Sequence, residues 1–383
     1  MKAISKIAIF LPKANAFYTS LIFQMKRGLE AHGVDVWCGL QHMDEVSLLG
    51  FCREWKPDVI FEMNRTRNEI PSLPKDIKHI AWVVDTNGRY NSHFKGSEII
   101  YFIGHNWMNA NQSTDSFVDF LPPGVCPQVY FYSESDQISD FSFVGHIPLP
   151  WDNEDKNRII ANGSDGQITF GDLLEQFIDR IEDTKKKYFT NDTYIEVAIQ
   201  LIKEILKESI ILNMDDIMRY DIGCRTIRML YRKKLVDLIL QISKDIRIFG
   251  SSNWEKWPEY KDYYISFLSN PLDIRNVYQT SRINLHEGVA LHFRSIDCLA
   301  SGGLLFYFED SPADDANESI CRYFEPDRHF ILFNKDNLAE KARYYLSDEQ
   351  SRRKIGQSAS HETMQNHTWH HRWRKILSDI KRL

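Results

Sequence analysis

The run from Ser281 to Gly303 constrains the fold more than any other part of the chain. An apolar segment meets a polar triplet, a helical segment follows, and a second apolar segment begins directly after paired glycines, reading SRINLHEGVALHFRSIDCLASGGLLFYF. This order predicts a strand, a loop, a helix and a neighbouring parallel strand. The loop of such a unit lies at the carboxyl edge of the sheet. Ligands of open α/β sheets bind at that edge, and a helix N-terminus there favours an anion.

Strands and helices alternate along most of the remaining chain. Short β-rich runs separated by helical patterns extend from residue 6 to 130, and a second alternating block begins at residue 140. This alternation predicts βαβ units and parallel sheets. We therefore expect an α/β protein with two Rossmann-like domains facing across a cleft. The expected domains cover 1–135 and 136–365, with a helical insertion at about 157–242 and a terminal helix at 366–383.

Size and composition exclude several classes of protein. A chain of 383 residues suits two domains, and its net charge of −6 argues against general nucleic-acid binding. No stretch approaches the roughly 18 apolar residues of a membrane span, and the N-terminus reads as a first strand rather than a signal peptide. Six scattered cysteines favour free thiols in a reducing cytoplasm: Cys38, Cys52, Cys126, Cys224, Cys298 and Cys321. We expect a soluble, cytoplasmic protein.

Several sequence pieces in a fixed order resemble one protein family. They are LPPGV at 121–125, SFVG at 142–145, IFGSSNW at 248–254, the run 281–303 and NHTWHHRW at 366–373. Together they resemble the CgeB-like (spore maturation protein) glycosyltransferases, whose fold is of the GT-B type. The resemblance implies transfer of a sugar from a nucleotide-linked donor. It also implies that the C-terminal helix crosses back to the first domain.

The same resemblance places the donor in the C-terminal domain and the acceptor on the N-terminal side. The implied donor is a UDP-, GDP- or dTDP-linked sugar. Asp297 stands where many GT-B enzymes place a glutamate that binds the ribose diol. Those enzymes often carry another acidic residue eight positions earlier, whereas here the nearest one, Glu287, is ten positions earlier. This departure leaves inverting and retaining chemistry both open.

Residues that follow strands are the candidates for binding the donor. Arg294 shares a helix face with Asp297, so it either holds the donor diphosphate or forms an ion pair with that carboxylate. The polar triplet after its strand either reaches the ligand or caps the strand: His286, Glu287 and Gly288. Gly145 and the turn from Gly250 to Trp254 follow two other strands. The backbone of these loops either contacts the phosphate or base of the donor or forms an ordinary turn.

The N-terminal half supplies candidates for catalysis and for acceptor binding. Asp85 ends a strand and begins a turn, so it is a candidate general base, with an Asx turn as the alternative. His105, after the following strand, is a second candidate base. Three polar residues at the end of the strand DVIF are expected on the acceptor side of the cleft: Glu62, Asn64 and Arg65.

No metal site is expected. His367 and His371 have i, i+4 spacing, but no glutamate completes a zinc motif, and this histidine cluster fits the packing of a terminal helix. The pairs Asp215–Asp216 and Asp314–Asp315 are adjacent, unlike the spaced aspartates of metal-dependent transferases. Arg294 and helix N-termini would replace the cation. The nucleotide sugar is then a co-substrate, and no cofactor is expected.

The hypothesis is therefore a metal-independent glycosyltransferase with a glycan or protein as acceptor. Two alternatives stay open because fold alone does not fix activity. One is an epimerase or hydrolase that acts on the nucleotide sugar by itself. The other is a non-catalytic partner subunit that uses the helical insertion as its interaction surface. The sequence leaves the oligomeric state open.

Overall fold

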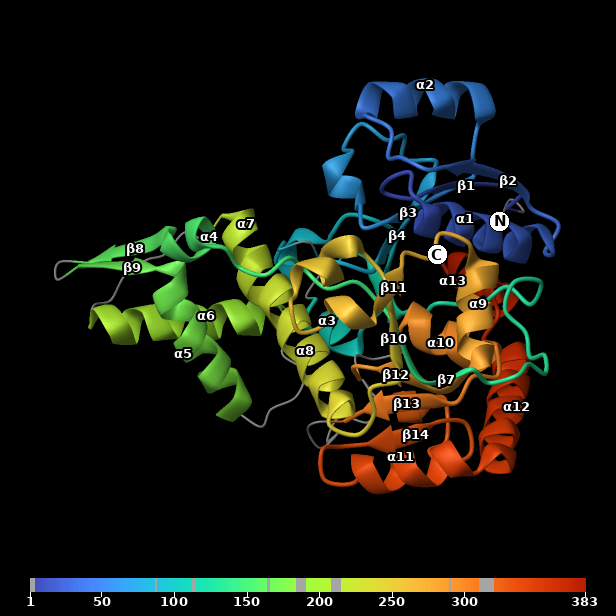
Figure 1. Ribbon diagram of the computed structural model, residues 1–383. Helices are drawn as coiled ribbons and strands as arrows, with labels where there is room; N and C mark the ends of the chain where they lie inside the picture. Colours follow the sequence, from blue (N-terminus) through green and yellow to red (C-terminus); the bar gives the residue numbers. More distant parts are fainter. Residues whose placement is uncertain are drawn as a thin grey trace.

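The protein is described by a computed structural model covering residues 4–86, 88–111, 115–163, 166–183, 191–207, 215–288, 291–309 and 320–383. Two six-stranded parallel sheets organise these residues (Figure 1). One sheet belongs to the N-terminal half and the other to the C-terminal half. The expectation of an α/β protein with two Rossmann-like sheets is confirmed.

The N-terminal sheet has the strand order β2-β1-β3-β4-β5-β6. Its strands are nearly continuous apolar runs, as expected for parallel strands with both faces covered. The strands are β1 (Lys6–Phe10), β2 (Asp35–Gly39), β3 (Val59–Met63), β4 (Lys78–Val83), β5 (Ile99–Phe102) and β6 (Phe117–Phe120). The helices are α1 (Ala16–Glu30), α2 (Glu45–Trp55) and α3 (His105–Ala110), with 3-10 turns at Arg67–Glu69 and Asn91–His93.

The C-terminal sheet has the strand order β11-β10-β7-β12-β13-β14. The strands are β7 (Ser139–Val144), β10 (Ile246–Phe249), β11 (Tyr264–Ser266), β12 (Ser281–His286), β13 (Leu305–Phe308) and β14 (Ile331–Phe333). The helices are α9 (Pro271–Thr280), α10 (Phe293–Ala300), α11 (Leu338–Ser347), α12 (Glu349–Asn366) and α13 (Trp369–Ile380). Three 3-10 turns cover Ser252–Lys256, Lys261–Tyr263 and Ile320–Arg322. The run SRINLHEGVALHFRSIDCLASGGLLFYF thus forms β12, a loop, α10 and β13.

The segment between β7 and β10 is an insertion with its own apolar core. It is not wholly helical, because it contains the antiparallel hairpin β8 (Ile159–Gly163) and β9 (Gly166–Thr169), whose Ala161 and Ile168 are buried. Its helices are α4 (Asn153–Asn157), α5 (Phe170–Asp183), α6 (Asn191–Leu206), α7 (Asp216–Tyr220), a π-helical stretch (Asp221–Thr226) and α8 (Ile227–Leu240). The hairpin, α5 and α6 project from the body of the molecule, whereas α8 lies along the C-terminal sheet (Figure 1).

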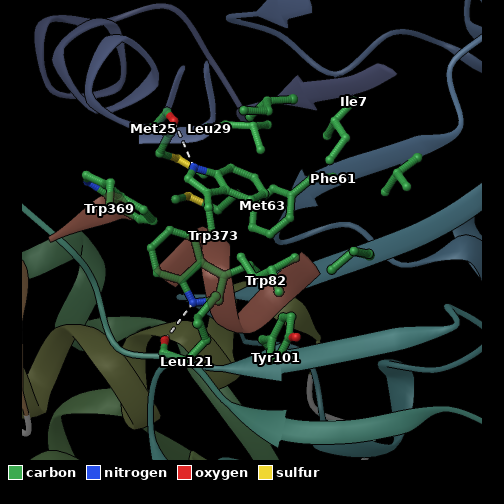
Figure 2. Close-up of a cluster of buried hydrophobic side chains, with 14 of the residues drawn as sticks. Ile7, Met25, Leu29, Phe61, Met63, Trp82, Tyr101, Leu121, Trp369 and Trp373 are labelled. Atoms are coloured by element: carbon green, nitrogen blue, oxygen red, sulfur yellow. Dashed lines mark hydrogen bonds between the residues drawn. The ribbon is translucent and has the colours of Figure 1, made fainter. Parts of the chain in front are cut away.

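Helix α13 packs into the core of the N-terminal half (Figure 2). Trp373 is fully buried there, and its indole N–H donates to the Met25 carbonyl of α1 at 2.8 Å. Trp82 of β4 is also fully buried, and its indole N–H donates to the Leu121 carbonyl at 2.9 Å. Buried indoles with satisfied N–H groups combine large apolar burial with a fixed orientation. The last helix therefore fastens the C-terminal half to the N-terminal half.

Among the described residues, no helix combines the length and the apolar composition needed to cross a membrane.

Candidate functional site

The carboxyl edges of the two sheets face each other. Helix α10 starts at the carboxyl edge of the C-terminal sheet, and its first residue, Phe293, packs against the N-terminal half. The Phe293 ring lies 5.2 Å from the ring of Phe17 in α1 and 5.7 Å from that of Trp82 in β4, measured between centroids. Ligands of open α/β sheets bind at such edges. This facing pair of edges is the candidate site.

A buried carboxylate organises the C-terminal edge. Glu287 directly follows β12 and accepts a hydrogen bond from Nε of Arg232 in α8 at 2.9 Å. It also accepts one from Nη2 of Arg294 in the first turn of α10. Nη1 of Arg294 donates to the Val144 carbonyl at the end of β7, at 3.0 Å. The sequence left a pair between Arg294 and Asp297 as the alternative, but the charge partner of Arg294 is Glu287.

The pKa values at this edge follow from burial and the nearby guanidinium groups. Burial alone would raise the pKa of Glu287, but Arg294 and Arg232 hold it well below its usual range. Burial and the same two arginines lower the pKa of His286 to about 3, against the opposing charge of Glu287. At neutral pH Glu287 is therefore charged and His286 is neutral.

Two buried polar atoms at the end of β12 lack a hydrogen-bond partner among the described residues. They are Oε2 of Glu287 and Nε2 of His286. The Gly288 amide donates to Nδ1 of His286 at 3.2 Å, so the neutral imidazole carries its proton on the unpartnered Nε2. The two residues are only 6% and 1% exposed. Buried polar groups are normally satisfied, so this donor and this acceptor mark the edge as a place for a polar ligand.

Helix α8 contributes two arginines that the sequence analysis did not single out. Arg228 and Arg232 lie one helical turn apart. Arg232 contacts Glu287 and the His146 carbonyl, whereas Arg228 forms an ion pair with Asp85, its Nη2 lying 2.9 Å from Oδ2. A usable signal was that Arg228 and Arg232 share a helix face with the apolar Leu235 and Ile239, which places two arginines in line with buried positions. Only the tertiary structure brings α8 to the edge of both sheets.

Asp85 lies at the carboxyl edge of the N-terminal sheet, as the sequence predicted. Asn64 accepts hydrogen bonds from the backbone amides of Val84 at 2.7 Å and Asp85 at 3.0 Å. Asn64 is 7% exposed, and its side chain connects the ends of β3 and β4. It therefore positions the candidate base, and its side-chain oxygen is already used within the protein.

Glu62 and Arg65 also make internal contacts rather than facing the other sheet edge. Glu62 is fully buried and accepts from Nε of Arg65 at 2.7 Å, while Nε2 of His79 lies 3.1 Å away. Side chains alternate along a strand, so Glu62 points to the same face as Ile60, the face covered by α2. The expectation that Glu62 faces the acceptor is corrected, because its buried carboxylate is enclosed by the N-terminal half.

The second candidate base, His105, is buried at the start of α3. Its ring stacks on Phe120, with centroids 3.9 Å apart. Nη1 of Arg322 lies 2.8 Å from Nε2 of His105, and a guanidinium can only donate, so this imidazole nitrogen accepts. With that lone pair engaged, His105 is poorly placed to take a proton from an acceptor.

Two glycine loops approach each other closely at the C-terminal edge. A Cβ atom on Gly250 would lie 2.1 Å from the Gly145 carbonyl oxygen, so only glycine fits there. Trp254 is fully buried, and its indole N–H donates to the same carbonyl at 2.8 Å. The sequence prediction of a donor-binding Trp254 is corrected accordingly: its ring is enclosed in the core and supports the Gly145 loop. Gly288, with φ +81°, passes so close to Phe308 that a Cβ would lie 1.8 Å from its carbonyl oxygen.

Asp297 lies on α10 beside Tyr130 and Tyr278. Burial raises the pKa of Asp297 well above its usual range, and a hydrogen bond with Tyr130 opposes this only in part. The phenol of Tyr130 is thus a hydrogen-bond partner of this buried carboxyl group.

No group of three or more histidine, cysteine or acidic side chains suited to a metal ion occurs among the residues that the structure covers. Nδ1 of His367 accepts from Arg372 at 2.9 Å, and His371 bonds Thr368 at the start of α13. Asp215 caps α7 through the Met218 amide at 2.7 Å. The pair Asp314–Asp315 lies outside the described residues.

Comparison with known protein families identifies the class of enzyme. A family model described as glycosyl transferase-like matches residues 225–378. The C-terminal half holds a glycosyl transferase-like domain. The matched residues include Arg228, Arg232, Glu287 and Arg294, so the charged edge lies within this domain. The predicted enzyme class, a glycosyltransferase, is confirmed.

Solved structures share the fold. HepE from Anabaena in complex with UDP-glucose aligns with a TM-score of 0.50 and 10% identity, covering 98% of this chain and 100% of HepE. Its complex with UDP aligns with a TM-score of 0.51 and 9% identity over the same shares. At this identity the likeness concerns the fold, which is of the GT-B type. A search of curated proteins finds no match to this chain.

Proposed function

We propose that this protein is a metal-independent glycosyltransferase that moves a sugar from a nucleoside diphosphate donor to a glycan or protein acceptor. The observation that carries the proposal is a cluster of three arginines at the C-terminal sheet edge. Arg232 and Arg294 both contact Glu287, and Arg228 lies one helical turn from Arg232 on α8. A glycosyltransferase must stabilise the negative charge that develops on the leaving diphosphate. Guanidinium groups bind phosphate oxygens in pairs of hydrogen bonds, so they can replace a metal ion in this task.

The positive charge of the arginine cluster is only partly balanced by carboxylates. Arg232 and Arg294 share the single carboxylate of Glu287, so these two arginines and Glu287 together carry one net positive charge. Arg228 has a carboxylate of its own, Asp85. An anionic ligand at this edge would therefore gain from the surplus charge and from the low-dielectric surroundings of buried groups.

The proposed donor-binding site lies in the C-terminal half, 136–365. The glycine loops at Gly145 and Gly250 would approach the nucleotide, and Asp297 would bind its ribose. UDP is the first nucleotide to test, with GDP and dTDP as alternatives, because the structurally similar HepE was solved with UDP and UDP-glucose. The resemblance to CgeB-like enzymes supports the same assignment.

The proposed acceptor-binding site lies in the N-terminal half, 1–135, and the segment 366–383 packs against that half. Asp85 is the proposed base. The acceptor oxygen bonds to the anomeric carbon as the bond from that carbon to the diphosphate oxygen breaks. The electron pair leaves with the nucleoside diphosphate, and the acceptor proton passes to Asp85. We place the protein in the cytoplasm because its six cysteines are scattered along the chain without paired spacing.

Nucleotide binding by the purified protein tests this proposal. Calorimetric titrations with UDP, GDP, dTDP and their sugar conjugates should show binding of one nucleotide family in the presence of EDTA. Arg294→Ala should weaken that binding at least tenfold. Lys233→Ala should not, because Lys233 lies on α8 but faces Glu259 and the Trp257 ring. Absence of binding by the wild type would overturn the proposal, and release of free sugar without any acceptor would identify a hydrolase instead.

A further inference from the structure

The ion pair between Arg228 and Asp85 joins the two halves of the chain. Arg228 belongs to α8 in the C-terminal half, and Asp85 follows β4 in the N-terminal half, 143 residues away in sequence. Nη2 of Arg228 donates to Oδ2 of Asp85 at 2.9 Å, and both side chains are partly exposed, at 30% and 27%. The half-buried guanidinium is therefore open to solvent on one side, where an anion with more charge can compete with the carboxylate.

Arg228 also belongs to the arginine cluster of the C-terminal sheet edge. It lies four residues, or just over one helical turn, from Arg232, about 6 Å along the axis of α8. The charges of Arg228, Arg232 and Arg294 all lower the pKa of His146. The charge of Arg228 also lowers the pKa of Arg232. A long, flexible arginine side chain at this position can reach either the carboxylate of Asp85 or an anion beside Arg232.

We propose that Arg228 exchanges partners during the reaction, leaving Asp85 to bind the diphosphate of the donor. Donor binding thereby removes the Arg228 guanidinium from the Asp85 carboxylate, which then accepts the proton of the acceptor hydroxyl. Arg228 is in this sense a positioning residue that couples the donor side to the acceptor side. The inference rests on the proposed function, since it needs a donor with a diphosphate group.

Charge and geometry favour the exchange. A diphosphate carries more negative charge than a single carboxylate, and it offers several oxygens to a planar guanidinium. When Arg228 turns toward the diphosphate, Asp85 stays in place, because the side chain of Asn64 accepts the backbone amides of Val84 and Asp85. The carboxylate therefore stays at the edge of the N-terminal sheet when its partner leaves. Without the donor it is engaged by Arg228, so acceptor activation follows donor binding.

A double-mutant cycle on nucleotide affinity tests the exchange without knowledge of the acceptor. UDP, or whichever nucleoside diphosphate the wild type binds, is titrated into wild type, Asp85→Asn, Arg228→Ala and the double variant. Asp85→Asn should tighten binding about threefold to tenfold, because Arg228 no longer has to leave a carboxylate. Arg228→Ala should weaken binding about tenfold or more, and Arg228→Lys should restore part of it. In the Arg228→Ala background, Asp85→Asn should change nothing.

The outcomes separate this inference from the proposed function. If Asp85→Asn raised the nucleotide affinity equally with and without Arg228, removal of the negative charge alone would explain the gain. That result would overturn the exchange. Unchanged affinity in Arg228→Ala would overturn it too, provided that Arg294→Ala still weakens binding, and the proposed function would then survive. A wild type that binds no nucleoside diphosphate would overturn both. Melting temperatures of all variants, with Lys233→Ala as the matched control on α8, show whether each variant is folded.

Discussion

Asn64 fixes the backbone of Asp85. Its side-chain oxygen accepts the Asp85 amide at 3.0 Å and the neighbouring Val84 amide at 2.7 Å, and its own backbone is left-handed with φ +63°. Asparagine tolerates this conformation better than most residues do. The turn that carries the proposed base at the end of β4 is therefore held by a residue at the end of the preceding strand, β3. The neighbouring strands β3 and β4 bring the two together.

Replacing Asn64 with alanine should destabilise the protein by about 1–3 kcal/mol, because two backbone amides lose their acceptor and alanine is strained at positive φ. Urea denaturation measures this loss. Asn64→Gly removes the acceptor without the strain, so it should lie between wild type and Asn64→Ala. Asn64→Asp keeps an oxygen in place and should be the mildest of the three. An alanine variant as stable as wild type would contradict the assigned contacts.

The buried Glu62 predicts a loss of stability in acid. Burial would raise the pKa of Glu62, but hydrogen bonds from His79 and Arg65 outweigh it and lower the pKa from 4.5 to about 2. A carboxyl group with a lowered folded-state pKa stabilises above its unfolded value, and this contribution is lost as pH falls from about 4.5 to about 2. A shift of this size corresponds to about 3 kcal/mol at neutral pH.

Urea denaturation at pH 7, 5 and 3 tests that dependence. Glu62→Gln should be less stable than wild type at pH 7, and the difference should narrow toward pH 3. The exposed Glu54 of α2 provides the matched control, since Glu54→Gln should leave the pH dependence of the wild type intact. A Glu62→Gln protein with the same acid sensitivity as wild type would show that Glu62 does not carry the effect.

Asp297 predicts the opposite dependence on pH. Burial raises its pKa well above 3.8, so ionisation is less favourable in the folded protein than in the unfolded chain. The stability of the wild type should therefore decline as pH rises from about 4 toward the raised pKa. Asp297→Asn, which is similar in shape and uncharged, should not show this decline. Melting temperatures at pH 5 and pH 8 compare the two, and an asparagine variant that melts lower than wild type at pH 8 would refute the prediction.

Gly250 predicts a steric effect confined to the glycine loops. In Gly250→Ala the new methyl group would meet the Gly145 carbonyl oxygen at 2.1 Å, so the two loops must separate. We expect a loss of about 1–3 kcal/mol, as for overpacking in a core, together with weaker nucleotide binding. Gly50→Ala is the control, because nothing lies within 4 Å of its Cβ position in α2. It should be neutral or stabilise by up to about 1 kcal/mol, and equal effects at the two sites would sink the argument.

The loop residues after β12 were predictable, whereas the arginines that a distant helix brings to the same edge were not. The unit from β12 to β13 pointed directly to Glu287 and Arg294, because a parallel strand followed by a helix always exposes its loop at the carboxyl edge. Arg228 and Arg232 escaped notice because helical spacing alone does not say which surface a charged face meets. Glu62 was misplaced for a related reason: a strand-end position does not fix which face of the sheet receives the side chain.

The sequence by itself determined the local elements, the two parallel sheets and the likeness to a family of transferases. These follow from hydrophobic periodicity and short-range motifs, which act over a few residues and need no knowledge of distant contacts. The tertiary structure alone decided the partners of the charges: Glu287 between two arginines, and Asp85 with Arg228. Electrostatic pairing depends on the distance between charges and on their burial. Both quantities are fixed only when α8 packs against the facing edges of the two sheets.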